Sequence, residues 1–223
     1  MDLNEVINGA PKTISIWAIP VLFAITLHEV AHGRMAKFFG DRTADLLGRL
    51  SLNPLRHIDP LGTVLIPLVL LAAHLPLFGW AKPVPVATGA LRNPRRASII
   101  VALAGPAANV LMALFWCAAL ALAVRIRVGE TVGNWLVLMA QAGIVANVVL
   151  ALFNLLPIPP LDGGRVVAGL LPPRIGASFE RLAPAGMFIV VALAVLGLFS
   201  WLLDPAYRGI AHLINALEMR LTT

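Results

Sequence analysis

Long runs of apolar residues, separated by short polar connections, dominate the pattern along this chain. A helix needs about 20 apolar residues to cross a hydrocarbon core about 30 Å thick. Backbone groups in hydrocarbon must be paired within the protein, so the runs are predicted to be helices. The pattern predicts about five to six membrane segments, at about residues 14–40, 61–80, 98–124, 132–156 and 185–203. The second of these is short and is interrupted by Pro67 and Pro76.

The remaining segments are too short or too polar to cross a membrane. Residues 162–172 are predicted to form a short helix, stopped by the following prolines. Residues 208–221 place apolar side chains at helical spacing, which predicts an amphipathic helix at the membrane interface. Alternation in GRLSL (48–52) and KPVPV (82–86) predicts short strands. We therefore expect an all-α polytopic membrane protein with re-entrant or β-strand connections and a C-terminal amphipathic helix.

Composition and charge agree with a membrane setting. Of the 223 residues, 59% are hydrophobic and 13% are charged, whereas a soluble domain has about 25% charged residues. The net charge of +6 does not point to nucleic acid, because the basic residues cluster between the apolar runs. The lone Cys117 excludes an intramolecular disulfide. We expect one membrane domain over residues 1–223, with a core at about 14–170 and C-terminal helices at 185–223, and no cleaved signal.

The distribution of basic residues bears on whether residues 61–80 cross the membrane. If they cross, 8 basic residues lie on one side and 9 on the other. If they enter and return, 12 lie on one side and 5 on the other. The positive-inside rule prefers the second arrangement. We therefore expect a re-entrant or hairpin-like segment, with residues 34–60 and 80–97 on the cytoplasmic side.

The motif HEVAH lies inside the first apolar run. His28 and His32 are four residues apart, so both imidazoles project from one helix face and can hold one metal ion, with Glu29 beside them as a base. The alternative is two core histidines with the glutamate as their partner. An acidic residue in a membrane helix costs roughly 2–3 kcal/mol, which favours a functional site.

Two histidines are too few for a catalytic zinc, which usually has three protein ligands and an open position. Asp162 is the candidate third ligand, because it directly follows the fourth apolar segment in FNLLPIPPLDGGR. Prolines unwind that helix end, and Gly163 and Gly164 allow close approach of the backbone. The alternative is an N-cap aspartate that opens a short helix at Gly163.

Three asparagines lie within the apolar segments. Asn109 occurs among small residues in ALAGPAANV, and Asn147 and Asn154 are two helical turns apart. Each can simply join helix to helix through hydrogen bonds. Asn154 lies eight residues before Asp162, near the expected metal site. His57 is interpreted as lining an entrance, as a spare metal ligand or as a structural residue.

The motifs HEVAHG, AGPAAN and NLLPIPPLDGG, in this order on successive segments, resemble the site-2 protease family of intramembrane zinc metalloproteases. The resemblance covers most of residues 14–170 and is closest to short members without PDZ or CBS domains. It implies that His28, His32 and Asp162 bind one zinc ion and that Glu29 activates water. It also implies that Asn154 hydrogen-bonds the substrate or its oxyanion, with Asn109 in a supporting role.

The expected activity is hydrolysis of peptide bonds in or near transmembrane segments of other proteins. Transmembrane proteins and the lipid bilayer are the expected partners, with KPVPV as a candidate edge for an unwound substrate. The expected location is a bacterial plasma membrane, with the site nearer the cytoplasm. The alternatives are a membrane metal-ion transporter and a catalytically inactive scaffold.

Overall fold

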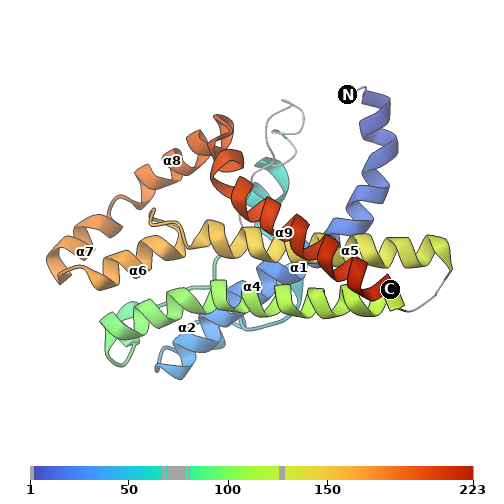
Figure 1. The fold of residues 1–223 in the computed structure, drawn as a ribbon. Coiled ribbons are helices and arrows are strands. Elements are labelled where there is room, and N and C mark those ends of the chain that lie inside the picture. Colours follow the sequence, from blue (N-terminus) through green and yellow to red (C-terminus); the bar gives the residue numbers. More distant parts are fainter. Residues whose placement is uncertain (1–2, 67–68, 70–78, 80, 126–128, 223) are drawn as a thin grey trace.

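The computed structural model describes residues 3–66, 69, 79, 81–125 and 129–222. Three helices in these ranges are long and apolar enough to cross a membrane: α1 (Leu3–Phe38), α4 (Pro94–Arg125) and α5 (Glu130–Asn154). The antiparallel α4 and α5 lie side by side, and α1 crosses both (Figure 1). The part of α1 that meets this criterion is Thr13–Phe38. The first, third and fourth predicted membrane segments are therefore confirmed as helices, and the chain is a membrane protein.

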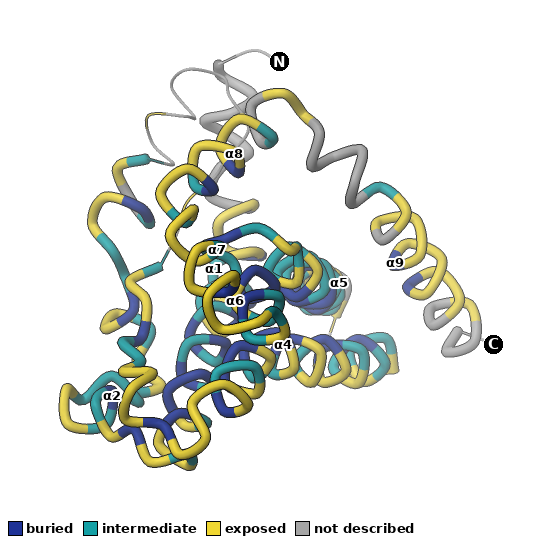
Figure 2. Tube along the Cα trace, turned by 90° about the vertical axis from the view of Figure 1, so that its left-hand side faces the viewer, coloured by how far each residue is buried: buried dark blue, intermediate teal, exposed yellow. Residues whose placement is uncertain are grey.

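Small residues bring the spanning helices together. A Cβ added to Gly143 on α5 would lie 2.2 Å from the ring of Trp116 on α4, so glycine is required for this approach. Large apolar side chains of α4, such as Leu111 and Leu114, are instead more than half exposed. Buried positions gather where the helices meet (Figure 2). Outward apolar side chains around a small-residue core are the packing expected of helices in lipid.

Shorter helices connect and flank the spanning ones. Before α4 these are α2 (Thr43–Leu46), η1 (Pro54–Arg56), η2 (Pro60–Leu65) and η3 (Thr88–Ala90). After α5 they are α6 (Asp162–Leu170), α7 (Pro173–Glu180), α8 (Ala183–Val195) and α9 (Leu198–Thr222). The short helix expected at residues 162–172 is thus confirmed as α6. Most of the predicted segment 61–80 lies outside the described residues.

The described residues form no strand, so the two predicted strands are wrong as secondary structure. GRLSL (48–52) forms a turn and an irregular connection, and KPVPV (82–86) is irregular throughout. In KPVPV the prolines have no N–H to donate, and the amides of Lys82 and Val84 bond to the His57 carbonyl and the Glu29 carboxylate. These amides therefore bond to isolated groups and not to a neighbouring strand.

The segment predicted at 185–203 is two helices and not one. α8 ends at Val195, and α9 begins at Leu198 after Gly197, whose φ of +71° is in the left-handed region that favours glycine. α7 and α8 could together make a fourth span, bent by 54°. The structure supports three membrane-spanning helices in the described residues, or four with this pair, and five to six are not confirmed.

The C-terminal amphipathic helix is present as the second half of α9. Its Ile210 and Ile214 are buried in a cluster with Trp116 and Leu120 of α4 and Ile144 of α5. Part of the apolar face of the helix is thus covered by protein, while Leu213 on the same face is 47% exposed. Its polar face carries an exposed ion pair between Asp204 and Arg208. The interfacial position that was expected for this helix stays a prediction.

The end of α1 meets the start of α4. The Arg92 amide donates to the Phe39 carbonyl at 2.7 Å, and the Arg92 guanidinium donates to the Phe38 carbonyl at 2.9 Å. α6 packs against α4 near the same end (Figure 1). The end of α1, the start of α4 and α6, which follows the end of α5, therefore lie in one region.

Candidate active site

Two histidines and an aspartate from distant parts of the chain meet inside the helix bundle. His28 and His32 lie one turn apart on α1, and Asp162 is the first residue of α6. The Nε2 atoms of the histidines are 3.0 Å apart, and Asp162 Oδ2 is 3.1 Å from His28 Nε2 and 3.2 Å from His32 Nε2. All three residues are buried. The predicted third ligand is therefore beside the two histidines.

Glycines make the space in which these side chains meet. A Cβ added to Gly105 of α4 would lie 2.3 Å from His32 Nε2 and 2.7 Å from His28 Cε1. Behind Asp162, a Cβ on Gly163 would lie 2.2 Å from the Leu155 carbonyl oxygen. Gly105 thus admits both imidazoles, and Gly163 lets α6 start directly against the end of α5.

Asp162 does not cap α6. The N-cap residue is Leu161, and no side chain caps the helix. Asp162 Oδ2 is buried and has no hydrogen-bond donor among the described residues. The alternative of a capping aspartate is therefore wrong, because the carboxylate is directed at the two imidazoles and not at the helix amides.

Hydrogen bonds on the far side of each imidazole determine which nitrogen carries the proton. His32 Nδ1 lies 2.7 Å from the Val101 carbonyl, which can only accept, and His28 Nδ1 lies 2.6 Å from Asn109 Oδ1. Both Nδ1 atoms therefore donate, and both Nε2 atoms present lone pairs toward Asp162. Two lone pairs and a carboxylate oxygen repel one another unless a cation lies among them. Two imidazole nitrogens and a carboxylate oxygen are a donor set that zinc takes in catalytic sites, so these residues fit the ion.

Glu29 lies next to this cluster and is held by a distant segment. Its Oε2 accepts a hydrogen bond of 2.7 Å from the Val84 amide. The amide belongs to the 81–87 segment, which contains KPVPV. Val84 itself is buried close to Gly33, one turn after Glu29. The carboxylate expected to act as a base is therefore oriented by the backbone of this segment.

The 81–87 segment is tied down on both sides of Val84. Before Val84, the Arg49 guanidinium donates to the Lys82 carbonyl at 2.8 Å. After Val84, the Ala87 amide donates to Asp41 Oδ2 at 2.7 Å. Burial alone would raise the pKa of Asp41, but hydrogen bonds from Thr43 and Ala87 outweigh burial and lower this pKa below its ordinary value. Asp41 is therefore an ionised anchor, and it is only 1% exposed.

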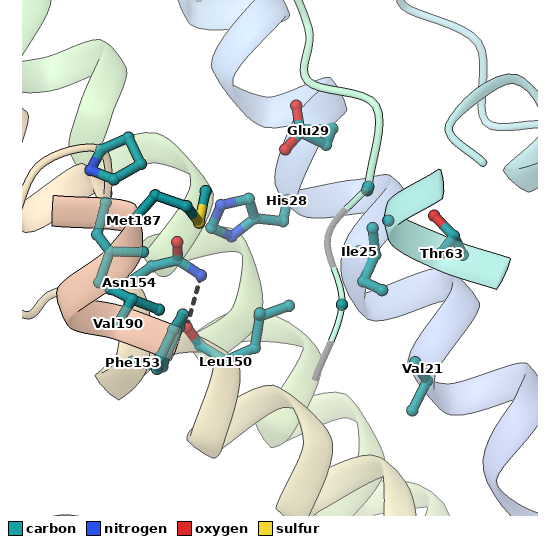
Figure 3. A pocket seen from close by; sticks show the side chains of 15 residues that line it. Val21, Ile25, His28, Glu29, Thr63, Leu150, Phe153, Asn154, Met187 and Val190 are labelled. Atoms are coloured by element: carbon teal, nitrogen blue, oxygen red, sulfur yellow. Dashed lines mark hydrogen bonds between the residues drawn. The ribbon is translucent and has the colours of Figure 1, made fainter. Parts of the chain in front are cut away.

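A cavity of about 410 Å³ opens beside His28 and Glu29. Asn154 lines it, and its amide nitrogen donates to the Leu150 carbonyl at 2.9 Å (Figure 3). Much of the remaining wall is apolar and comes from α1, α5, α8 and η2: Val21, Ile25, Thr63, Leu150, Phe153, Met187 and Val190. Ala81, Pro160 and Leu161 also line it. The cavity can therefore hold apolar side chains next to the polar cluster.

Asn109 and Asn147 form a buried chain of hydrogen bonds behind His28. The Asn109 amide nitrogen donates to the Ala24 carbonyl at 3.1 Å and to Asn147 Oδ1 at 3.0 Å. The Asn147 amide nitrogen donates to the Gly143 carbonyl at 2.9 Å. Both asparagines are 0% exposed. They do join helices, as the sequence suggested, but the chain of bonds also ends on a histidine of the cluster.

Other residues singled out from the sequence lie apart. His57 is buried, its Nε2 lies 2.9 Å from the Ser51 carbonyl, and it is outside the three-residue cluster. Sequence reasoning missed the roles of Val84 and Asp41, because Val84 acts through its backbone amide and Asp41 accepts from the backbone amide of Ala87. The only available signal was KPVPV, where alternate prolines leave few amides free to donate.

The profile of peptidase family M50 matches residues 121–197. The protein named "Putative zinc metalloprotease YwhC" of Bacillus subtilis strain 168 is 39% identical over 189 residues, which are 84% of this chain and 83% of that protein. Two proteins named "Putative zinc metalloprotease Rip2" are also similar. The one from Mycolicibacterium smegmatis is 33% identical over 83% of this chain and 69% of its own length. The one from Mycobacterium tuberculosis H37Rv is 32% identical over 87% and 74%. No solved structure matches the chain significantly.

Proposed function

This chain belongs to peptidase family M50 and is a zinc metalloprotease, and from that premise we propose that it cuts peptide bonds within the membrane. The substrates are transmembrane segments of other proteins. The observation that carries the proposal is the cluster of His28, His32 and Asp162 inside a bundle of membrane-spanning helices. The cavity beside His28 and Glu29 would admit a substrate that is itself in the membrane.

His28, His32 and Asp162 would hold the zinc ion. Bound there, zinc would supply Lewis-acid chemistry, which polarises a peptide carbonyl and lowers the pKa of a water molecule toward 7. The Val101 carbonyl and Asn109 Oδ1 keep the two Nε2 lone pairs directed at the site. The buried carboxylate of Asp162 supplies the negative charge that the two neutral imidazoles lack.

Glu29 acts as the general base and then as the general acid. It takes a proton from the attacking water and returns it to the leaving amine. The Val84 amide holds Oε2, which leaves Oε1 to exchange the proton. A base with one oxygen fixed loses less rotational freedom when substrate binds, which favours the reactive geometry.

Asn154 is the donor for the developing oxyanion. Its side chain lines the cavity with His28 and Glu29, and one of its two amide hydrogens is used by the Leu150 carbonyl. The second hydrogen is available to a substrate oxygen. The bond to Leu150 fixes the orientation of the amide before substrate arrives.

The substrate enters as an opened chain, because a hydrogen-bonded helix shields its carbonyls from attack. The 81–87 segment lies beside the base and is a candidate partner for the opened chain. Since Pro83 and Pro85 cannot donate, the substrate would bond mainly to carbonyls there. The apolar walls of the cavity favour aliphatic or aromatic side chains at the cut.

The site lies nearer the cytoplasm of a bacterial plasma membrane in this proposal. The contact between Arg92 and Phe39 brings the end of α1 and the start of α4 to one side. Residues 61–80 would then enter and return, as the basic residues also indicate. In this topology, the side with more basic residues is also the side of the C-terminal end of α1, near His28 and His32.

Two variants test the mechanism in proteoliposomes that contain a transmembrane substrate. Glu29→Gln should retain one zinc per chain and lose cleavage by at least a factor of 100. Asp162→Ala should lose both zinc and cleavage. Glu180→Gln, an exposed change of the same chemistry on α7, is the matched control. Full cleavage by Glu29→Gln would contradict the proposal, and zinc flux that this variant leaves unchanged would favour a transporter.

A further inference from the structure

We propose that Asn147 and Asn109 form a relay that sets the tautomer of His28 and thereby the affinity of the metal site. This inference rests on the proposed assignment of His28 as a zinc ligand. Asn109 touches His28 directly, whereas Asn147 acts only through Asn109. Both are positioning residues, since neither belongs to the three-residue cluster nor to the cavity lining.

Main-chain carbonyls determine which way the side-chain amides of Asn147 and Asn109 face. The Gly143 carbonyl can only accept, so the Asn147 amide nitrogen must face it and Asn147 Oδ1 must face Asn109. The Ala24 carbonyl and Asn147 Oδ1 are both acceptors, so the Asn109 amide nitrogen must face them. Asn109 Oδ1 is then left to accept from His28 Nδ1.

A reversed Asn109 amide would break this arrangement. Its oxygen would face the two acceptors Ala24 O and Asn147 Oδ1, and its nitrogen would donate to His28 Nδ1. The proton of His28 would then move to Nε2 and occupy the lone pair that the metal needs. Asn147 therefore supplies one of the two contacts that prevent the wrong tautomer.

His32 provides an internal comparison. Its Nδ1 bonds to the Val101 carbonyl, which no side-chain substitution removes and which cannot reverse. The two ligands from one helix thus have different kinds of support, one from side chains and one from the backbone. Loss of the relay should affect His28 and leave His32 unchanged.

A purely structural role for Asn147 predicts something different. If it only joined α5 to α4, its loss would lower stability without changing the protonation of either histidine. The control for this reading is Ile144→Ala, which opens a cavity one turn away on α5 in the cluster with Trp116 and Leu120. A loss of this kind costs stability and does not touch the relay.

The experiment measures tautomers and zinc affinity in purified protein in detergent. Nitrogen NMR of zinc-loaded, 15N-histidine-labelled protein should show a hydrogen-bonded Nδ1–H on both His28 and His32, because the ion and not a proton then lies among the two Nε2 atoms and Asp162. Asn147→Leu should weaken the hydrogen bond of the His28 Nδ1–H, leave that of His32 as it was, and weaken zinc binding about 10- to 100-fold in chelator competition. Ile144→Ala should change neither. If Asn147→Leu does not fold, Asn147→Ser, whose side chain is polar but shorter, replaces it, and the same changes are expected.

A double variant separates relay from independent packing. Asn109→Leu with Asn147→Leu should bind zinc no more weakly than Asn109→Leu alone, because Asn147 has no other route to the metal. Additive losses, or an unchanged His28 Nδ1–H signal in zinc-loaded Asn147→Leu, would overturn the relay. His28→Ala is the separate test of the ligand assignment, and undiminished zinc affinity in that variant would instead contradict the proposed function.

Discussion

At the scale of single residues, the site depends as much on absent side chains as on present ones. The side chains of His28 and His32 can lie together only because Gly105 has no Cβ. Asp162 reaches them only because Gly163 lies against the end of α5. The sequence motifs contain these glycines, but periodicity alone does not say what they face. Their function becomes clear from distances to atoms in other helices.

Gly105→Ala should therefore weaken metal binding without altering any ligand. Its Cβ would lie 2.3 Å from His32 Nε2, so the imidazoles must move, at a cost of about 1–3 kcal/mol for overpacking. We expect zinc affinity to fall at least tenfold in chelator competition. Gly133→Ala on α5 is the control, because its Cβ would meet nothing within 4 Å. Equal zinc affinity in both variants would show that the space at Gly105 does not matter.

The proposed ligands His28, His32 and Asp162 were the part of the site most accessible from the sequence. His28 and His32 follow from helical spacing, and Asp162 was proposed because prolines and glycines surround it at a helix end. The environment of Glu29 was not accessible in the same way. Its partner is the backbone amide of Val84, and an amide has no sequence signature beyond the prolines on either side.

At the scale of elements, the 81–87 segment is the connection that brings a backbone amide to Glu29, the proposed base. Alternation of Lys, Pro and Val predicted a strand, yet the amides bond to isolated acceptors and no ladder forms. Asp41 and Arg49 fix the two ends of the segment. Pattern-based assignment failed here because tertiary hydrogen bonds decided the conformation.

Asp41→Asn should loosen this segment. The new amide nitrogen would face the Ala87 amide, donor against donor, at a cost of about 1–3 kcal/mol for a buried unpaired group. Cleavage should fall while zinc content stays at one per chain, because the metal ligands are not touched. The control is Asp45→Asn, whose carboxylate pairs with Lys37 at the surface. Unchanged cleavage in Asp41→Asn would separate the segment from catalysis.

The same carboxylate predicts an acid dependence of stability. The pKa of Asp41 is lower in the folded protein than its ordinary value, so its contribution is present above pH 3.8 and is lost as pH falls through the folded pKa. Thermal unfolding in detergent should therefore show a smaller drop in Tm below pH 4 for Asp41→Asn than for the parent chain. An identical acid dependence in the two proteins would contradict this assignment.

At the scale of the whole molecule, three spanning helices were predictable from the sequence, whereas the division of the apolar run at 185–203 into two helices was not. Runs such as 98–124 are long, apolar and uninterrupted, so they have one reasonable interpretation. The run at 185–203 is equally apolar, but Gly197 at positive φ divides it into α8 and α9. Hydropathy depends on side chains, so it does not detect a helix break that the backbone conformation of one glycine causes.

Topology is testable by labelling. In a Cys117→Ala background, single cysteines at Leu61 and at Gly79, both exposed, should react with a membrane-impermeant reagent from the same side. The reason is that the end of α1 and the start of α4 are joined by the Arg92 hydrogen bonds. Reaction from opposite sides would mean that residues 61–80 cross the membrane once.

The meeting of α1 with α6 also makes the proposed metal site a cross-link in the chain. His28 and Asp162 are far apart in sequence, so an ion held by both would close a long loop and reduce the entropy of the unfolded chain. An ion that binds only the folded state stabilises it by about 2.7 kcal/mol at 100 times its Kd. Removal of zinc by a chelator should therefore lower Tm and speed proteolysis in the parent chain and in Glu29→Gln alike. Inactivation by metal loss would then become irreversible over time, because the separated helices are exposed to degradation.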